Sequence, residues 1–161
     1  MATATHIPTK LGFAQGLLQP GETVSFGNSG AGVFVCGLLT GTTLPPMGSS
    51  GIQFVSQAQT ANTEQSFAGY SRQNLTGVSW AYDPSGVAID WTFSNITFSQ
   101  QAADPGTSRY GFIGYYTTLQ SGDSNAPVVC ILDFGQTVST VNGSLVLQSP
   151  ASGLISYTGF G

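Results

Sequence analysis

Charged side chains are scarce in this 161-residue chain. Asp, Glu, Lys and Arg make up 6% of the residues, against about 25% in an ordinary globular domain. Three residues are basic, namely Lys10, Arg72 and Arg109, and the formal net charge is -4. Because nucleic-acid binding requires Lys and Arg to neutralise phosphates, the composition excludes a nucleic-acid-binding protein.

Histidine is equally scarce. The single histidine, His6, precedes the first element that the pattern predicts, whereas a catalytic base must be held in a fixed geometry. The chain also lacks a Walker phosphate loop, a GxGxxG motif after a strand, the zinc motif HExxH and the nucleophile motif GxSxG. We therefore expect no enzymatic activity, no cofactor and no metal site.

Long apolar runs are missing too. No run approaches the roughly 20 residues that a membrane-spanning helix needs. The opening MATATHIPTK lacks a basic segment followed by an apolar one. We therefore expect no membrane span, no secretory signal and a chain made in a cytoplasm. Residues 1–12 show no period and predict an extended N-terminal arm.

The chain has two cysteines, Cys36 and Cys130, and each lies in an apolar run. Cysteine in such runs usually behaves as a small hydrophobic residue. A bridge between them would close a long loop and add stability, but two isolated cysteines in a cytoplasmic chain are usually free. We expect two free thiols.

Glycine, serine, threonine and short alternating apolar segments are abundant, and 22 residues are glycine. No stretch of about ten residues shows a helical period, and about eight short segments read as strands between turn signals. The pattern predicts a single all-β domain over residues 1–161, a sandwich that is jelly-roll-like or related, with long loops. Residues 33–39 predict a central strand, and residues 52–58 a short strand.

Residues 75–93 give the strongest structural prediction, a hairpin around a turn at residues 83–86. The apolar phase changes near residues 94 and 95, which predicts a bulge or bend there. Alternation in this region predicts a set of core aromatic residues, namely Trp80, Trp91, Phe93 and Phe98.

A second hairpin is predicted over residues 138–147, because Asn142 and Gly143 form the strongest two-residue hairpin signal. Before it, the run VVCILDF at 128–134 is apolar on both faces and carries one charge, Asp133. A carboxylate there is costly to bury unless it is paired. We expect Arg72 or Arg109 to reach Asp133, and we interpret Arg72 as part of a structural or intersubunit ion pair.

The remaining aspartates allow a further reading as a glycan hydrolase, which works with two carboxylates. However, Asp83, Asp104 and Asp123 stand beside Pro or Gly in turn sequences that account for them. We therefore rank the hydrolase third among the candidate functions.

One order of segments resembles a known family. An acidic residue precedes a GYxRQ segment, which is followed by a Trp-bearing strand and then by an ITF strand. The positions concerned, within residues 52–147, are Glu64, Gly69, Tyr70, Arg72, Gln73, Trp80, Ile96, Thr97 and Phe98. This order resembles small structural proteins of tailed bacteriophages. Such proteins are head decoration (cement) proteins or tail-fibre components.

The resemblance implies a non-enzymatic virion protein, rich in β-structure and often trimeric. We expect a capsid decoration protein that binds the major capsid protein, stabilises the phage head, and is assembled in the bacterial cytoplasm. A homotrimer would also cover the apolar faces of residues 128–134. The alternative is a tail-fibre or receptor-binding domain that stacks host glycans on exposed Tyr or Trp.

Overall fold

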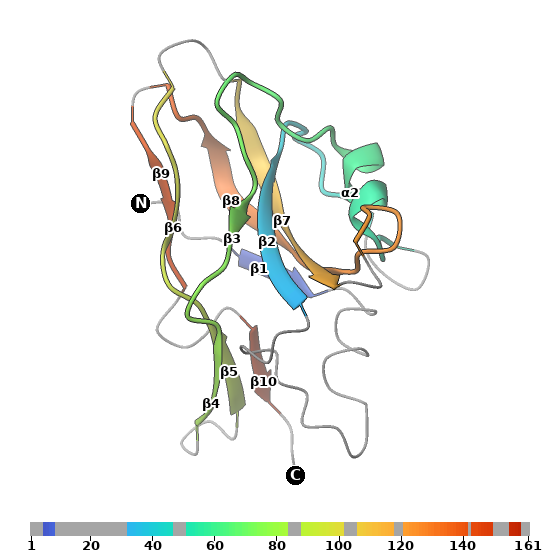
Figure 1. Cartoon of the computed structure of the whole chain (residues 1–161), viewed down its shortest axis with the longest axis vertical. Helices are drawn as coiled ribbons and strands as arrows, with labels where there is room; N and C mark the ends of the chain where they lie inside the picture. Colours follow the sequence, from blue (N-terminus) through green and yellow to red (C-terminus); the bar gives the residue numbers. More distant parts are fainter. Residues whose placement is uncertain are drawn as a thin grey trace.

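The computed structural model is built mostly from antiparallel β-strands, as expected for an all-β chain (Figure 1). It describes residues 5–8, 32–46, 51–83, 88–101, 106–117, 121–141, 143–149 and 155–158. The elements in these ranges are β1 (Thr5–Pro8), β2 (Gly32–Leu39), α2 (Val55–Ala61), β3 (Gln73–Asn74), β4 (Ser79–Asp83), β5 (Ala88–Thr92), β6 (Ile96–Phe98), β7 (Ser108–Thr117), β8 (Val128–Val138), β9 (Leu145–Leu147) and β10 (Ile155–Thr158).

The largest sheet has five strands in the order β1-β8-β7-β2-β3. Its long central strands β7 and β8 are apolar along most of their length, and β2 pairs with β7 over all eight of its residues. The segment predicted as a central strand is therefore β2, with β7 on one side and the short β3 on the other. Figure 1 shows α2 beside one face of this sheet and β6 and β9 beside the other.

Both faces of the main sheet are buried along most of β2 and β7 and along the first part of β8. On one face the even-numbered residues of β2 pack with residues from β5, β6 and β9; this core includes Phe34, Leu38, Trp91, Phe98 and Leu147. On the other face a second core joins the sheet to α2 and its flanking loops; it includes Leu39, Val55, Ala58, Phe112 and Ile131. Strands with two covered faces are apolar along the covered part, which explains the sequence of β2 and of residues 128–132 of β8.

The run VVCILDF is covered within a single chain. Val128, Val129, Cys130, Ile131 and Leu132 are each at most 9% exposed, divided between the two cores. The expectation that a neighbouring subunit covers this strand is therefore wrong, because α2 and the β6–β9 pair already do so.

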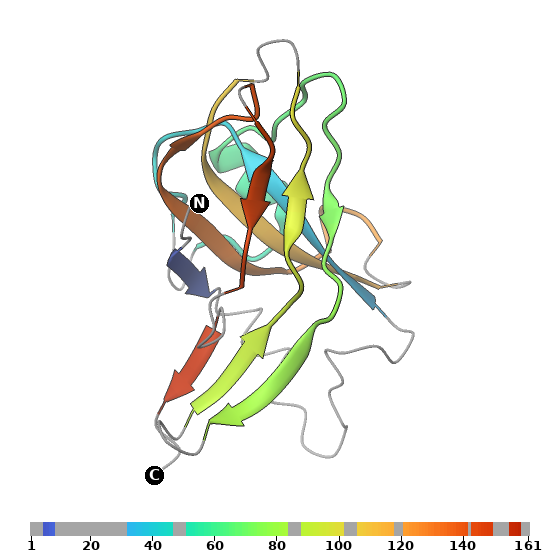
Figure 2. The same cartoon turned by 90° about the vertical axis from the view of Figure 1, so that its left-hand side faces the viewer.

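A second sheet, with the order β10-β5-β4, lies beyond the end of the main sheet (Figure 2). The first predicted hairpin is confirmed, since β4 and β5 pair antiparallel with Trp80 opposite Trp91. Of the turn predicted at residues 83–86, residues 84–86 lie outside the described residues, as does the side chain of Trp80. Trp91 is 1% exposed, and its ring lies 5.2 Å from that of Phe34, so the hairpin is anchored in the first core.

The change of apolar phase after Phe93 marks a change of sheet. β5 ends at Thr92 and β6 begins at Ile96, which pairs with β9 and not with the β4–β5 hairpin. Phe93, Ile96 and Phe98 are all buried in the first core. The irregular residues 93–95 thus let odd-numbered and even-numbered positions face one core.

The second predicted hairpin is wrong in its pairing. The chain does turn at Thr140 to Gly143, but β9 pairs with β6, with Ile96 opposite Leu147. Leu145 and Leu147 are buried against the first core. Because β9 crosses to the layer that faces the main sheet, it covers the core and does not extend the edge of β8.

The prediction of a short strand over residues 52–58 is also wrong, because residues 55–61 form α2. Val55 and Ala58, three positions apart, are both fully buried, which matches one face of a helix. The backbone N–H groups of Val55 and Ser56 donate to the carbonyls of Ala126 and Asp123. A helix this short is held by such tertiary contacts and not by its own propensity.

Cys36 and Cys130 are free, as expected, and both are fully buried. Both lie opposite Ile113, on the two strands that flank β7. Their Cα atoms are therefore about 10 Å apart, two strand spacings, which is more than a disulfide can span. Burial raises the pKa of both thiols well above the usual value.

The first twelve residues are described only at Thr5–Pro8. These residues are extended, as β1, and pair with the outer edge of β8, with Thr5 opposite Asp133. The part of the predicted arm that the structure describes is thus an edge strand of the main sheet.

We expect Gly37→Ala to destabilise the protein. A β-carbon at Gly37 would lie 2.4 Å from the ring of Phe112, which crosses the strand there, and 3.1 Å from Glu64 Oε1. Overpacking of this kind costs about 1–3 kcal/mol of unfolding free energy, measurable by urea titration. Gly143→Ala is the matched control, because a β-carbon there meets nothing within 4 Å. Equal stability of the two variants would contradict this packing.

Candidate functional site

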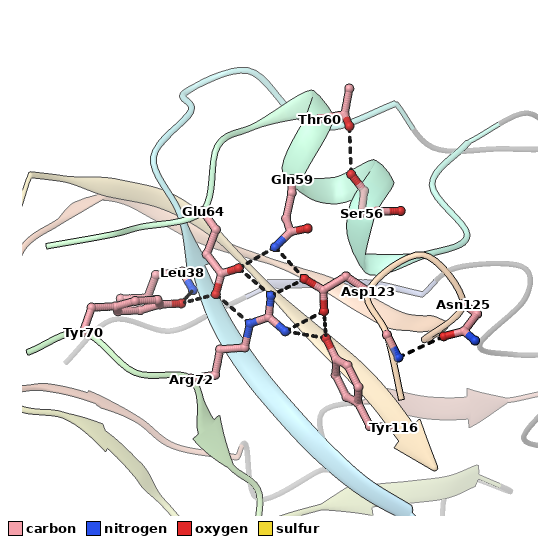
Figure 3. Close-up of polar contacts among 11 residues, drawn as sticks. Leu38, Ser56, Gln59, Thr60, Glu64, Tyr70, Arg72, Tyr116, Asp123 and Asn125 are labelled. Carbon is pink, nitrogen blue, oxygen red and sulfur yellow. Dashed lines mark hydrogen bonds and ion pairs between the residues drawn. The ribbon is translucent and has the colours of Figure 1, made fainter. Parts of the chain in front are cut away.

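The most elaborate polar site in the described part of the chain surrounds Arg72, the residue before β3. We define the Arg72 cluster as Gln59, Glu64, Tyr70, Arg72, Tyr116 and Asp123. These side chains come from α2, from the segment between α2 and β3, from β7 and from the loop between β7 and β8. Figure 3 shows Glu64, Asp123 and Tyr116 around the guanidinium group, and Gln59 and Tyr70 bonded to the carboxylates.

Arg72 binds two carboxylates at once. Its Nε and Nη2 donate to Glu64 Oε1 and Oε2 at 2.8 and 2.7 Å. Its Nη1 and Nη2 donate to Asp123 Oδ1 and Oδ2 at 2.8 and 2.7 Å. Both contacts are bidentate, the geometry in which arginine and carboxylate bind most strongly.

The remaining N–H of Nη1 donates to the hydroxyl oxygen of Tyr116. All five N–H donors of the guanidinium group are therefore used within the chain. The group also lies 5.3 Å from the ring centroid of Phe112, which adds an electrostatic attraction to the ring face. An anion from solution would have to displace one of the two carboxylates in order to bind Arg72.

Three neutral side chains complete the cluster. Gln59 Nε2 donates to both carboxylates, at 2.7 Å to Glu64 and 2.9 Å to Asp123. Tyr116 donates its hydroxyl to Asp123 at 2.7 Å, and Tyr70 donates to Glu64 at 2.8 Å. The Tyr70 hydroxyl in turn accepts the backbone N–H of Leu38 on β2. The cluster thus links the edge of the main sheet to α2.

The backbone explains how Glu64 and Asp123 reach this place. Glu64 forms an isolated bridge with Leu39, and Gln65 N–H donates to the Leu38 carbonyl, so this segment follows the end of β2. Asp123 lies in a turn that Asn125 closes by accepting the N–H of Gly122. These backbone contacts hold Glu64 and Asp123 at positions from which both carboxylates reach Arg72.

The surroundings of Glu64 and Asp123 keep both carboxyl groups ionised at neutral pH. Burial opposes ionisation of Glu64, but hydrogen bonds from Arg72, Gln59 and Tyr70 outweigh it and lower the pKa of Glu64. Hydrogen bonding to Arg72 lowers the pKa of Asp123 well below its usual range. Hydrogen bonds to the two carboxylates raise the pKa of Arg72 further.

This geometry is suited to a structural link. A hydrolase that works with two carboxylates needs one of them protonated near neutral pH, as the general acid. Glu64 and Asp123 bind one guanidinium group, and the pKa of each is lowered, so neither can serve as that acid. Burial also raises the pKa of Tyr70 and Tyr116, so both phenols stay neutral.

Arg72 and Asp133, the two residues expected in ion pairs, do not contact each other. Arg109 contacts Asp133, with Nε 2.8 Å from Oδ1, and also donates to the Gly135 carbonyl. The Gly135 N–H donates to Asp133 Oδ1 at 2.8 Å, and Gly135 has a positive φ of 72°. It lies where the register between β7 and β8 is irregular, between the pairs Tyr110–Asp133 and Ser108–Val138. Asp133 lies on β8 next to β1, and β7 and β2 separate it from the edge where Arg72 lies.

The sequence did not reveal that Asp123 belongs to this cluster. Its place beside Gly122 accounts for it as a turn residue, and the structure shows that it is one. Its carboxylate is nevertheless 51 positions from Arg72 in sequence and bound to it in space. Glu64, Tyr70 and Arg72 are among the positions on which the expected relationship to phage proteins was based, and the structure brings these three together.

Within the described residues, no group of three or more His, Cys, Asp or Glu side chains is arranged to hold a metal ion. No described helix is long and apolar enough to cross a membrane. Comparisons with protein-family models, with curated proteins and with solved structures found no match to this chain.

We expect the Arg72 cluster to make stability depend on pH. Folding lowers the pKa of both carboxyl groups, so their contribution is complete above their ordinary values, about 4. This contribution to stability is lost as the pH falls from the ordinary pKa values toward the lower pKa values of the folded protein. The double variant Glu64→Gln, Asp123→Asn should therefore be less stable than the wild type at pH 7 and should lose less stability on acidification.

Urea titration of both proteins from neutral to acidic pH measures this difference. We expect a loss of about 2 kcal/mol at pH 7, below the ~3–5 kcal/mol of a fully buried pair, because the Asp123 side chain is 33% exposed. Parallel stability curves for the two proteins across the acidic range would contradict the assignment.

Proposed function

We propose that this chain is a capsid decoration protein of a tailed bacteriophage, which binds the major capsid protein and stabilises the head. It acts without enzymatic chemistry, by adding contacts on the virion surface after assembly in the bacterial cytoplasm.

One observation supports it most. Glu64, Tyr70 and Arg72 belong to the segment order that resembles small phage structural proteins, and all three meet in the Arg72 cluster. These residues lie within eight positions of one another in the sequence. Their side chains also bind distant parts of the chain, because Tyr70 accepts the N–H of Leu38 on β2 and Arg72 donates to Asp123. In this chain the acidic residue, the tyrosine and the arginine of the segment are bound to one another, which gives their order in the sequence a structural reason.

The charge distribution is compatible with a contact surface made of neutral groups. Both described arginines, Arg72 and Arg109, are bound to carboxylates of their own chain. The partner surface on the capsid would therefore be recognised mainly through hydrogen bonds, shape and apolar contact. Long connections between the strands supply such surfaces.

We further propose that the fold is a sandwich related to the jelly roll and that the protein is a homotrimer. The first proposal is supported by the β6–β9 pair, which faces the five-stranded sheet across the first core. The trimer is implied by the resemblance to phage proteins, and the covered strand β8 gives it no support.

A second candidate function is a tail-fibre or receptor-binding domain that recognises host surface glycans. One observation favours it, a hollow with aromatic and uncharged polar walls between residues 67–73 and 97–101. The glycan hydrolase ranks below both, because the two clustered carboxylates are held ionised by Arg72.

Immunogold electron microscopy of particles from the source lysate tests the proposed function. Antibody raised against the recombinant chain should place gold over the heads, and antibody absorbed with that chain should place none. Gold at the tail tip would favour the fibre candidate. Particles without gold on any part would contradict a virion protein of either kind.

A further inference from the structure

A hollow of about 270 Å³ lies beside the Arg72 cluster, with which it shares Tyr70, between the turn before β3 and the end of β6. Figure 2 shows β3 and β6 running side by side, so two segments distant in sequence form its walls. Small-molecule sites usually begin at about 300 Å³. The hollow therefore fits one small ring and not a long chain.

Aromatic rings form the apolar part of the hollow. Phe67 meets Tyr70 edge to face, with ring centroids 5.3 Å apart, and Tyr70 stacks on Phe98 at 6.2 Å with an interplanar angle of 6°. Phe98 is buried in the first core, whereas Phe67 and Tyr70 are half-buried. Buried Phe98 thus supports the Tyr70 ring, and Phe67 and Tyr70 are the two rings that are partly accessible to a ligand.

Uncharged polar side chains form the rest of the wall. Ser71, Gln73, Thr97, Ser99 and Gln101 supply hydroxyl and amide groups that can both donate and accept hydrogen bonds. Among the described residues that line the hollow, none carries a charge. A wall of this kind suits a neutral ligand with several hydroxyl groups.

The two glutamines are oriented by their own segments. Gln73 Nε2 donates to the Ser71 carbonyl at 2.9 Å, and Gln101 Nε2 donates to the Ser99 carbonyl at 3.2 Å. Gly69, with φ of 84°, allows the close approach of Gln101, because a β-carbon there would lie 2.6 Å from Gln101 Oε1. Polar groups fixed before binding lose less entropy when a ligand arrives.

Charged ligands fit this hollow poorly. Arg72 lies one residue from Ser71, but all five of its donors are bound to Glu64, Asp123 and Tyr116. A phosphate, a carboxylate or a nucleotide would therefore find no cation here. A pyranose ring, in contrast, has C–H groups that pack on aromatic rings and hydroxyl groups that bond to amides and hydroxyls.

We propose that the hollow is a binding subsite for one neutral pyranose ring of a glycan. The ring packs against Phe67 and Tyr70, and its hydroxyl groups bond with Gln73, Gln101 and Ser99. This site does not depend on whether the protein decorates heads or belongs to a fibre. In either place it would give the virion a contact with surface sugars.

Chemical shift mapping of the ¹⁵N-labelled full chain tests the site. The probes are the methyl glycosides of glucose, galactose, mannose and N-acetylglucosamine at millimolar concentration, with glucuronate as the charged probe. At least one neutral sugar should shift the amide signals of residues 67–73 and 97–101, and glucuronate should not. If a neutral oligosaccharide shifts the same signals at lower concentration than the methyl glycosides do, the natural ligand is a polymeric glycan. If the oligosaccharide and the methyl glycoside bind with equal affinity, the site recognises a single ring.

Two variants test the location, after circular dichroism has shown that they are folded. Gln101→Ala removes an amide of the wall, and Ser99→Trp fills the hollow from an exposed position. Each should weaken sugar binding at least tenfold. Gln148→Ala is the matched control, an exposed glutamine after β9 that does not line the hollow, and it should bind as the wild type does.

Three outcomes would overturn the proposal. The first is that none of the neutral sugars or oligosaccharides shifts any signal. The second is that shifts occur at other residues, or survive unchanged in both hollow variants. The third is that glucuronate binds as well as the neutral sugars do.

Discussion

The double bidentate contact of Arg72 with Glu64 and Asp123 is the constraint on which the rest of the structure depends. The chain has few charges, and this one guanidinium group, beside the start of β3, binds the segment next to the end of β2, the end of β7 and the loop before β8. Because all five donors are bound, the contact fixes directions as well as distances. A chain whose surface is built from serine, threonine, asparagine and glutamine has few other means of holding its long connections in place.

The cluster also positions the second core. Asp123 binds Arg72 through its side chain and accepts the N–H of Ser56 at the start of α2 through its carbonyl. That helix has seven residues, too few for independent stability, yet it buries Val55 and Ala58 against β7 and β8. On the opposite side Tyr70 carries the cluster to the first core, where it stacks on Phe98. The Arg72 cluster thereby connects α2, which packs on one face of the main sheet, with β6, which packs on the other.

The sequence predicted what local patterns decide. Alternation over residues 75–93 predicted the β4–β5 hairpin, and a run apolar on both faces predicted β2 as an internal strand. The patterns could not predict partners. The turn near Gly143 was predicted correctly, but no local pattern indicates that Leu145–Leu147 pairs with β6, 47 or more positions earlier, and not with β8. α2 is too short for a helical period to appear. Asp123 was accounted for by its turn, so its contact with Arg72 was invisible in the sequence.

The central claim is that Arg72 holds α2 and the segment that follows it against the main sheet. Hydrogen exchange on the Arg72→Ala variant tests this claim most directly. The account predicts much faster exchange of the Ser56 and Val55 amides, which donate to the 121–127 loop, and of Gln65, which donates to Leu38. The β7–β8 amides should keep their protection, and Arg109→Ala should leave the three named amides unchanged. Protection of those amides equal to the wild type in Arg72→Ala would contradict the account.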